Sequence, residues 1–233
     1  MGKMTLLSVG TNAKTVKGDG KETGYLTAIM YMAPHKGNSF GVNLCPRATV
    51  GCAAACLNIA GRGAFTSVQK ARIRKADWFI QDRPAFLKQL EHELLLFSSY
   101  ARRKGFKPVV RLNGTTDILW ETLIDMTKFP EIQFYDYTKW SRRQRLKVQH
   151  IPNYHLTFSR AEDTTDLSLK TQVETGLNVA VVFDEIPQTY LGFPVFNGDN
   201  NDLRFLDPKG HIIGLSAKGK AKKDTSGFVV RVK

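Results

Sequence analysis

The sequence predicts an α/β fold, a partial (β/α) barrel with an appended C-terminal β-rich section. The chain has 233 residues, of which 42% are hydrophobic, and this is enough to bury a core without disulfides. From residue 108 onward, short apolar segments alternate with segments of helical pattern, and the connections between them are short. Such alternation favours parallel strands joined by right-handed crossovers. We expect an N-terminal arm and edge strand over residues 1–38, a barrel core over 39–186 and the C-terminal extension over 187–233.

The expected strands are rich in β-branched and aromatic residues and are bounded by turn residues. They cover residues 24–32, 39–44, 108–112, 132–137, 154–158, 178–183 and 212–215. The expected helices have apolar residues at helical spacing, and the second of them has Asp82 as its cap and Gly105 as its stop. They cover residues 66–80, 82–105, 118–129, 140–149 and 165–175.

The charge balance is strongly basic. Thirty-four Lys and Arg residues against 21 Asp and Glu residues give a formal net charge of +13. This excess indicates a polyanionic partner, either nucleic acid or a phosphate-rich substrate, unless it serves only solubility. No apolar run approaches the roughly 20 residues of a membrane-spanning helix, and the N-terminal residues lack a secretory pattern. We therefore expect no membrane partner and a cytoplasmic location.

The three cysteines of the chain lie within twelve residues. Cys45, Cys52 and Cys56 form a C-x6-C-x3-C run in a loop rich in small residues. An odd number of closely spaced cysteines is a poor disulfide framework, and thiolates are preferred ligands of zinc and of iron–sulfur clusters. The run therefore predicts a [4Fe–4S] cluster or a zinc site, for which His35 is the nearest histidine. Buried structural cysteines are the remaining alternative.

Polar residues follow four of the expected strands. They are Asn113, Gly114, Thr115, Thr116 and Asp117 after the first, Asp136 and Lys139 after the second, Ser159 and Arg160 after the third, and Asp184 and Glu185 after the fourth. The carboxyl ends of parallel strands converge on the ligand site of an α/β sheet or barrel. We expect these residues to gather near the cysteines, although Thr116 or Asp117 would also serve as a plain helix cap.

One short segment combines basic and aromatic residues. Its candidate nucleic-acid contacts are Lys139, Trp140, Arg142, Arg143, Arg145 and Lys147, beside Tyr135 and Tyr137. Single-stranded nucleic acids bind to such surfaces through phosphate contacts and base stacking. The arginines do not all share one helix face, so part of the group would be merely solvated. A second basic group consists of Arg62, Lys70, Arg72, Arg74 and Lys75.

The order of these features resembles that of the radical S-adenosylmethionine (SAM) enzymes. In that family a three-cysteine loop after the first strand of a partial barrel binds [4Fe–4S], and a glycine-rich turn after the second strand holds SAM. The resemblance implies that Asn113–Asp117 form this turn, that Ser159 and Arg160 contact the cofactor, and that the basic surface holds a nucleic-acid or phosphorylated substrate. The family's spacing is C-x3-C-x2-C, and its Gly-Gly-Glu sequence is absent here.

A second resemblance extends over nearly the whole chain. The segments LCPRATVGCAAACLNIAGRG, VVRLNGTTDILWE and NGDNNDLRFLDPKGHIIGLSAKGKA are similar to those of the tailed-phage gene product 88 family. This resemblance implies a phage origin and no particular reaction. It also implies that the protein acts in the cytoplasm of an infected bacterium, where thiols stay reduced.

Two further segments lie near the C-terminus. The acidic turn at residues 198–207 would bind a divalent cation or be simply solvated, and the lysine loop at 217–223 would contact phosphate or be solvated. The sequence thus leaves three hypotheses. The first is a radical-SAM-like iron–sulfur protein, and the second is a non-enzymatic nucleic-acid-binding protein with structural zinc. The third is a metal-dependent nuclease that uses Asp117, Asp136 and Asp184.

Overall fold

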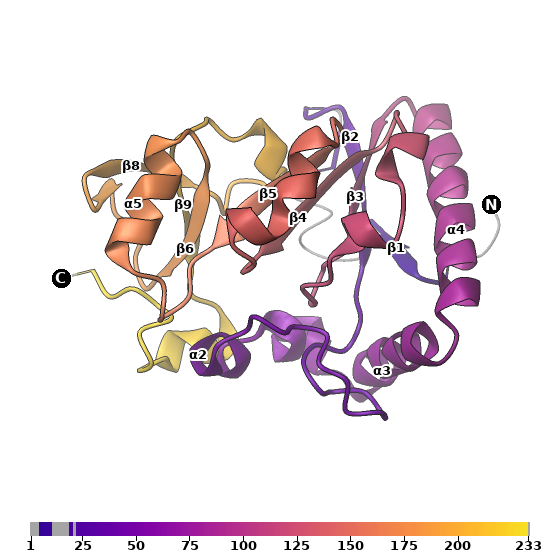
Figure 1. Cartoon of the computed structure of the whole chain (residues 1–233), viewed down its shortest axis with the longest axis horizontal. Coiled ribbons are helices and arrows are strands. Elements are labelled where there is room, and N and C mark those ends of the chain that lie inside the picture. The colour runs from indigo at the N-terminus through magenta and orange to yellow at the C-terminus, as the bar shows by residue number, and fades with distance from the viewer. Residues whose placement is uncertain (1–4, 11–18, 21, 233) are drawn as a thin grey trace.

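The computed structural model describes residues 5–10, 19–20 and 22–232. Within these ranges the chain forms a nine-stranded sheet in the order β1-β2-β3-β4-β5-β6-β9-β8-β7 (Figure 1). The strands are β1 (Leu7–Val9), β2 (Tyr25–Met30), β3 (Lys107–Arg111), β4 (Gln133–Thr138), β5 (Tyr154–Ser159), β6 (Val179–Phe183), β7 (Thr189–Tyr190), β8 (Phe193–Asn197) and β9 (Ile212–Ser216). All neighbours from β2 through β8 pair in parallel, and β1 and β7 pair antiparallel at the two ends. The predicted α/β class with a mostly parallel sheet is confirmed.

Four α-helices are described. They are α2 (Val50–Ala54), α3 (Thr66–Gln81), α4 (Arg83–Arg103) and α5 (Asp166–Glu174). Short 3-10 turns cover Leu57–Ile59, Gly61–Ala64, Trp120–Thr122, Met126–Lys128, Arg142–His150, Arg204–Leu206 and Gly219–Lys223. Helices α3 and α4 lie at the β1–β3 end of the sheet, whereas α5 lies at the β6–β9–β8 end (Figure 1). The predicted helices at 66–80, 82–105 and 165–175 are therefore confirmed within two residues at each end.

Two predicted helices are wrong. Residues 118–129 contain only two 3-10 turns, because Asn113 fixes the chain that follows it. The Asn113 Oδ1 atom accepts hydrogen bonds from the Ile118 backbone N–H at 2.9 Å and from the buried Trp120 indole N–H at 3.1 Å. Residues 140–149 are also built from 3-10 turns, with non-helical backbone angles at Arg145. Tertiary bonds thus override a helical sequence pattern in both segments.

The predicted strand at 39–44 is a loop. The side-chain oxygen of Asn38 accepts hydrogen bonds from the backbone N–H groups of Phe40 and Val42, both at 3.1 Å. Asparagine side chains commonly compete with extended structure in this way, because they offer the backbone a local partner. The loop still delivers Cys45 to the sheet edge, as the sequence predicts.

The C-terminal section is part of the main sheet. Strand β9 lies directly beside β6, and β8 lies beside β9, both in parallel. The acidic segment 198–207 turns back onto the sheet, where Leu203 is buried against Val109 and Tyr135. Arg204 is fully buried as well. The expectation of a solvated turn is therefore wrong for Leu203, Arg204 and Asp207, which are buried, whereas Asn200 and Leu206 are exposed.

Two apolar cores hold the helices to the sheet. The larger lies between α3, α4 and the strands β2–β4, with Phe79, Phe86, Phe97 and Trp120 at its centre. The smaller one joins α5 to β6 and β9. Burying aromatic side chains of this size is among the strongest stabilising contributions in a domain of this length.

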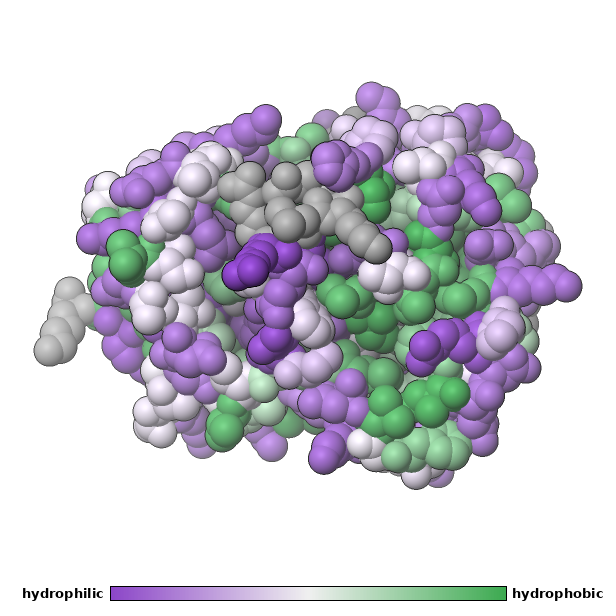
Figure 2. Space-filling view, viewed as in Figure 1, coloured by the Kyte–Doolittle hydropathy of each residue, from purple (hydrophilic) through white to green (hydrophobic). Residues whose placement is uncertain are grey.

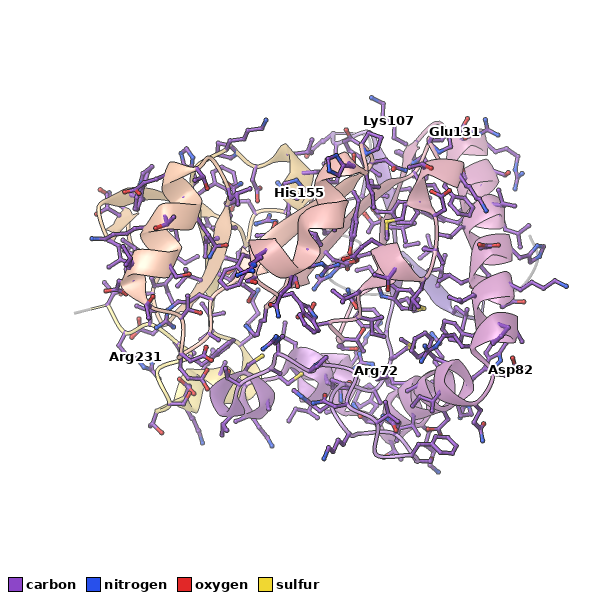
Figure 3. All side chains as sticks on the ribbon, in the orientation of Figure 1. Arg72, Asp82, Lys107, Glu131, His155 and Arg231 are labelled. Carbon is purple, nitrogen blue, oxygen red and sulfur yellow. The ribbon has the colours of Figure 1, made fainter. Side chains whose placement is uncertain are left out.

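The carboxyl ends of the parallel strands share one edge. Lys107 and Glu131, at or just before the starts of β3 and β4, lie at the upper edge in Figure 3, and Arg72 and Arg231 lie toward the lower edge. The cysteine segment and the C-terminal segment run along this lower edge (Figure 1). In the part of the chain that the structure describes, no helix has the length and apolar character needed to cross a membrane.

Candidate metal and ligand site

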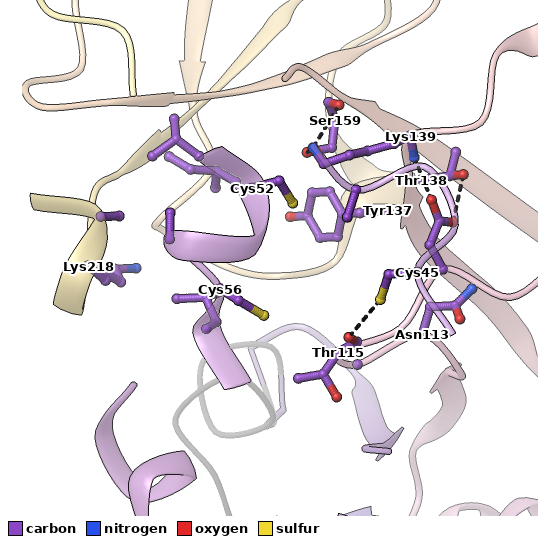
Figure 4. A pocket seen from close by; sticks show the side chains of 18 of the residues that line it. Cys45, Cys52, Cys56, Asn113, Thr115, Tyr137, Thr138, Lys139, Ser159 and Lys218 are labelled. Atoms are coloured by element: carbon purple, nitrogen blue, oxygen red, sulfur yellow. Dashed lines mark hydrogen bonds between the residues drawn. The ribbon is translucent and has the colours of Figure 1, made fainter. Parts of the chain in front are cut away.

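A cavity of about 260 Å³ opens at the carboxyl edge of the sheet. All three cysteines line it, together with the turn that follows β3 and the ends of β4, β5 and β9. Figure 4 shows the three sulfur atoms directed toward a common space, with the Tyr137 ring beside it. The prediction that strand-end residues gather near the cysteines holds for Asn113–Asp117, Lys139 and Ser159. It is wrong for Asp136, Arg160, Asp184 and Glu185, which do not line this cavity.

Helix α2 holds Cys52 at the cavity wall. Thr49 caps the helix, and its Oγ1 accepts a hydrogen bond from the Cys52 N–H at 3.3 Å. The Glu162 carboxylate then accepts from Thr49 Oγ1 and from the Gly51 N–H, both at 2.6 Å. A carboxylate at a helix N-terminus satisfies N–H groups that have no partner inside the helix. Glu162 therefore fixes the α2 end next to Cys52, a role that the sequence pattern did not indicate.

The loop after Cys56 is clamped by α3. Arg72 Nη1 donates to the Asn58 carbonyl and to its side-chain oxygen, both at 2.6 Å, and Gln69 Nε2 donates to the same carbonyl at 2.8 Å. The Asn58 N–H in turn donates to Cys56 Sγ at 3.5 Å. Arg72 belongs to the second basic group of the sequence, but it is buried and its guanidinium lies over the Tyr31 ring. It positions the third cysteine.

The thiols stand in a poorly hydrated environment. Burial raises the pKa of Cys45 to about 12, although a hydrogen bond from the His35 backbone opposes the shift. Burial also raises the pKa of Cys52, and the nearby Lys139 ammonium partly offsets it. Cys45 Sγ donates to the Thr115 carbonyl at 3.5 Å. Burial thus favours the protonated form of these thiols. A bound metal would favour the thiolates instead, because it displaces the proton when it binds sulfur.

The turn after β3 is built from its own side chains. Asn113 Oδ1 accepts from Thr116 Oγ1 at 3.0 Å, and Thr115 Oγ1 donates to the Met32 carbonyl at 2.6 Å. Gly114 lies against β2, where an added Cβ would stand 2.5 Å from the Met30 carbonyl oxygen. The Asp117 carboxylate accepts from Thr138 Oγ1 and the Lys139 N–H, both at 2.8 Å. These side chains hold the shape of the turn around the cavity.

Six of the seven predicted cofactor residues line this cavity. They are Asn113, Gly114, Thr115, Thr116, Asp117 and Ser159. The Arg160 side chain is used elsewhere, because its Nη1 donates to the carbonyls of Gly227 and Phe228 at 2.7 and 3.2 Å. Arg160 thereby ties the C-terminal segment to β5, and Phe228 forms part of the cavity wall.

The predicted nucleic-acid group does not form one surface. Lys139 Nζ donates to Ser159 Oγ at 3.2 Å inside the site, and the Trp140 indole N–H donates to the Asp117 carbonyl at 3.1 Å. Arg145 is buried, bound to Glu121 at 2.6 Å and to the Tyr154 hydroxyl at 3.1 Å. Arg143 is exposed, and the side chains of Arg142 and Lys147 lie outside the described part of the structure. Arg145 is thus a core residue and its assignment as a surface contact is wrong.

The three aspartates of the nuclease hypothesis are separately engaged. Burial raises the pKa of Asp136 to about 7, and its carboxylate accepts from the Asn113 N–H at 2.7 Å and from Tyr154 at 3.0 Å. Asp184 accepts from the Val232 N–H at 3.0 Å near the C-terminus. Across residues 5–10, 19–20 and 22–232, no group of three or more His, Cys, Asp or Glu side chains gathers around a single point to hold one metal ion, and this applies to the three cysteines as well as to the aspartates. The aspartates therefore do not assemble a nuclease site.

The acidic turn pairs with cations of the chain itself. Asp199 accepts from Lys218 Nζ at 2.6 Å, Asp202 accepts from Arg111 Nη1 at 3.1 Å, and an Asp207 oxygen lies 3.2 Å from Arg204 Nη1. Such pairing leaves no cluster of carboxylates for a divalent cation, so the expected cation site is not formed. Asp199, Asp202 and Lys218 instead line the end of the cavity formed by the C-terminal segment.

A comparison with models of protein families shows to which family this chain belongs. The model of the family described as Gene product 88 matches residues 5–232. The chain belongs to the gene product 88 family. Membership gives a bacteriophage context and confirms the resemblance to the gene product 88 family that the sequence indicated. No curated protein and no solved structure matches the chain.

Proposed function

We propose that this gene product 88 protein is an iron–sulfur protein that holds a [4Fe–4S] cluster on Cys45, Cys52 and Cys56. The observation that carries the proposal is that three cysteines from one short segment line a single cavity, with their sulfur atoms directed into it. Thiolates are the usual ligands of such clusters. Burial desolvates Cys45 and Cys52, and Lys139 lies near Cys52; a bound metal would replace the thiol protons in such a setting.

A cluster suits the arrangement better than a single zinc ion. Four-coordinate zinc needs its ligands gathered around one point, and the chain has no fourth cysteine. A [4Fe–4S] cluster would be held by Cys45, Cys52 and Cys56 without all three sulfur atoms gathering around a single ion. His35 lines the same cavity and is the candidate fourth ligand of the zinc alternative.

The cavity beside the cysteines supports a bound ligand of the SAM type. Three thiolates would leave one iron of a [4Fe–4S] cluster without a protein ligand, and such a cluster would supply one-electron reduction to a ligand held in this cavity. The main chain of Gly114 and Thr115, the Ser159 hydroxyl and the Lys139 ammonium line the space next to it. The strands β2 to β6 are adjacent in chain order, as in a partial (β/α) barrel, which supports a radical-SAM-like enzyme.

The unusual cysteine spacing has a local cause in this fold. The six residues between Cys45 and Cys52 include the Thr49 cap and the first two residues of α2, Val50 and Gly51. The longer spacing therefore accommodates a helix start that Glu162 anchors to the end of β5. With this longer spacing between Cys45 and Cys52, all three thiols line the same cavity.

Iron content tests the cluster. Protein purified without oxygen from bacterial cytoplasm is expected to be brown, to absorb near 400 nm and to contain about four irons per chain. Each of Cys45→Ser, Cys52→Ser and Cys56→Ser should lose most of this iron. Ala53→Ser adds the same hydroxyl to an exposed position of α2 and should retain it. A colourless protein with one zinc would contradict the proposal.

SAM is tested separately on the iron-loaded protein. We expect equilibrium binding of SAM under anaerobic conditions, and its reductive cleavage when dithionite is added. Ser159→Ala removes a hydroxyl from the cavity wall and should weaken SAM binding, whereas Ser168→Ala on the exposed face of α5 should not. An iron-loaded protein that binds no SAM would limit the function to the cluster alone.

A further inference from the structure

The segment that carries the cysteines contains no acidic residue. Residues 23–76 include seven Lys and Arg and no Asp or Glu, and residues 208–223 include five Lys and again no Asp or Glu. Long acid-free stretches are uncommon in a chain with 21 acidic residues, and they concentrate positive charge wherever they meet.

The fold brings the two acid-free segments together at the cavity. Ala55 of the cysteine segment packs against Ala217 and Ala221, and Gly219 faces Ala60. The lysines of the C-terminal segment therefore lie beside α2, and Lys218 lines the same cavity as the cysteines. Apart from Lys209, which precedes β9, the exposed basic residues on the two segments are Lys36, Arg47, Arg62, Lys70, Arg74, Lys218, Lys220, Lys222 and Lys223.

Exposed apolar side chains are concentrated on the same segment. Of the ten large hydrophobic residues that are exposed in the described structure, six lie between residues 40 and 65. They include Phe65 at 60% exposure and Phe40 at 47%. Figure 2 shows hydrophobic residues at the lower right of this face, where Figure 1 places α3 and the loop before it. Clustered apolar exposure of this kind marks an interaction surface.

We propose that a single-stranded nucleic acid binds across this edge, with its phosphates on the two acid-free segments and its bases against Phe40 and Phe65. It would be the substrate of the iron–sulfur site, and in that respect the inference rests on the proposed function. Lysines on both sides of α2 suit a chain of regularly spaced phosphates. Exposed aromatic rings suit unpaired bases, which stack on them without regard to sequence.

The cavity explains why the strand is single. A group that reacts beside the cysteines has to enter a space of about 260 Å³ below the surface. A base stacked inside a duplex cannot reach such a space without first being extruded. An unpaired nucleotide crosses the mouth of the cavity with its base free to enter.

The binding surface differs from the one that the sequence favoured. Lys139 and Arg145 are bound to Ser159 and Glu121 inside the molecule, so these two residues do not offer their charge to an external phosphate. Arg47 does reach that region, where its guanidinium lies 4.8 Å from the centre of the Trp140 ring. Trp140 therefore lies next to the surface formed by the two acid-free segments, in contact with its residue Arg47.

Fluorescence anisotropy with a labelled 20-nucleotide oligo(dT) over a salt series tests the phosphate contacts. Lys220→Ala, Lys222→Ala and Lys223→Ala combined should weaken binding and reduce the slope of log K against log salt by about 2, at roughly 0.7 for each lost contact. The matched control is Lys88→Ala, Arg103→Ala and Lys104→Ala combined, which removes the same charge from exposed positions of α4 and its C-cap. Equal losses in both triple variants would overturn the proposal.

A second pair of variants tests base stacking. Phe65→Ala should weaken oligo(dT) binding about five-fold or more. Leu95→Ala, which removes a side chain of 57% exposure from α4, should leave it unchanged. Displacement of oligo(dT) by polyglutamate at equal charge would show that only charge matters and would overturn the proposal, as would equally tight binding of a blunt duplex.

The proposed cluster and the proposed nucleic-acid binding can be contradicted independently of each other. Anisotropy is measured both on protein loaded with iron and on protein stripped of metal, and metal content is measured on each sample. Oligo(dT) binding that depends on the acid-free segments in both samples supports the inference whatever the metal content. An iron-loaded protein with no such binding retains the proposed cluster and overturns the inference.

Discussion

The Asp202 carboxylate lies 3.1 Å from Nη1 of Arg111, although the two residues are 91 positions apart in the chain. Asp202 also accepts a hydrogen bond from the Tyr135 hydroxyl at 2.9 Å. Both side chains of the ion pair are largely buried, with exposed fractions of 7% for Arg111 and 14% for Asp202. The Asp202 carboxylate thus joins the acidic segment to β3 and β4. It also holds in place the part of the cavity wall that the C-terminal segment forms.

Removing this carboxylate should destabilise the fold strongly. Asp202→Ala leaves the Arg111 guanidinium buried without its counter-charge, a change that typically costs about 3–5 kcal/mol. The measurement is the free energy of unfolding from urea titration. Asp163→Ala, at an exposed position, serves as the control and should change it by less than about 0.5 kcal/mol.

The double variant Arg111→Met with Asp202→Leu distinguishes a lost interaction from an uncompensated charge. Replacing both partners of a buried ion pair by apolar residues is often neutral or stabilising. We therefore expect the double variant to recover most of the stability that Asp202→Ala loses. A double variant as unstable as the single one would show that the hydrogen bonds to Tyr135 and Tyr137, rather than the burial of charge, account for the loss.

Buried arginines show the limits of sequence-based prediction for this chain. Arg72, Arg145 and Arg204 were expected on the surface or not considered, because a charged residue is usually exposed. Arg145 is buried only because Glu121 and Tyr154 meet it in space, 24 and 9 residues away. No local pattern indicates such partners, so the predicted nucleic-acid helix could not be corrected from the sequence.

The strands and the cysteine site were easier to predict. Strands such as Val179–Phe183 are short apolar runs between turn residues, and their place in the sheet follows from chain order. The cysteines and the turn at Asn113–Asp117 come together because both follow parallel strands. The position of β9 between β6 and β8 was missed, because the excursion through Phe193–Asn197 carries no signal of where it returns.

Gly114 should not tolerate a side chain. In Gly114→Ala the new Cβ would lie 2.5 Å from the Met30 carbonyl oxygen and 2.8 Å from an Ile29 methyl carbon. Because β2 cannot give way cheaply, we expect a loss of about 1–3 kcal/mol in the free energy of unfolding. Gly10→Ala meets no atom of the described residues within 4 Å and serves as a reference for the strain of a positive φ angle. A cost for Gly114→Ala below that of Gly10→Ala would contradict the close approach of the turn to β2.

We expect the Glu162 carboxylate to hold helix α2, which carries Cys52, in its position. Glu162→Ala removes the acceptor of the Thr49 hydroxyl and the Gly51 N–H, and a lost charge-assisted hydrogen bond costs about 1–3 kcal/mol. In metal-free protein we expect faster alkylation of Cys52 by iodoacetamide, because the helix that buries it is loosened. Asp163→Asn at the neighbouring exposed position should leave the alkylation rate unchanged. An unchanged rate in Glu162→Ala would show that the C-terminal segment alone holds α2.

His155 should make the protein less stable in mild acid. Burial, reinforced by the nearby charges of Arg204 and Lys209, lowers the pKa of His155 to about 4, and its Nε2 atom has no hydrogen-bond partner in the described structure. Between pH 6.5 and 4 the unfolded chain binds a proton at this residue and the folded chain does not. The free energy of unfolding therefore falls as the pH drops through this window, by at most about 3 kcal/mol from His155.

The variant His155→Gln isolates this contribution from the carboxylates. Burial raises the pKa of Asp136 to about 7 and of Asp207 to about 6, so these groups take up protons in the folded state and act in the opposite direction. Their contribution cancels when the unfolding free energies of the variant and the original protein are subtracted at each pH. The difference should be constant above pH 7 and should shift in favour of the variant between pH 6.5 and 4. A difference that stays flat across that range would show that His155 is protonated in the folded protein, in contact with solvent.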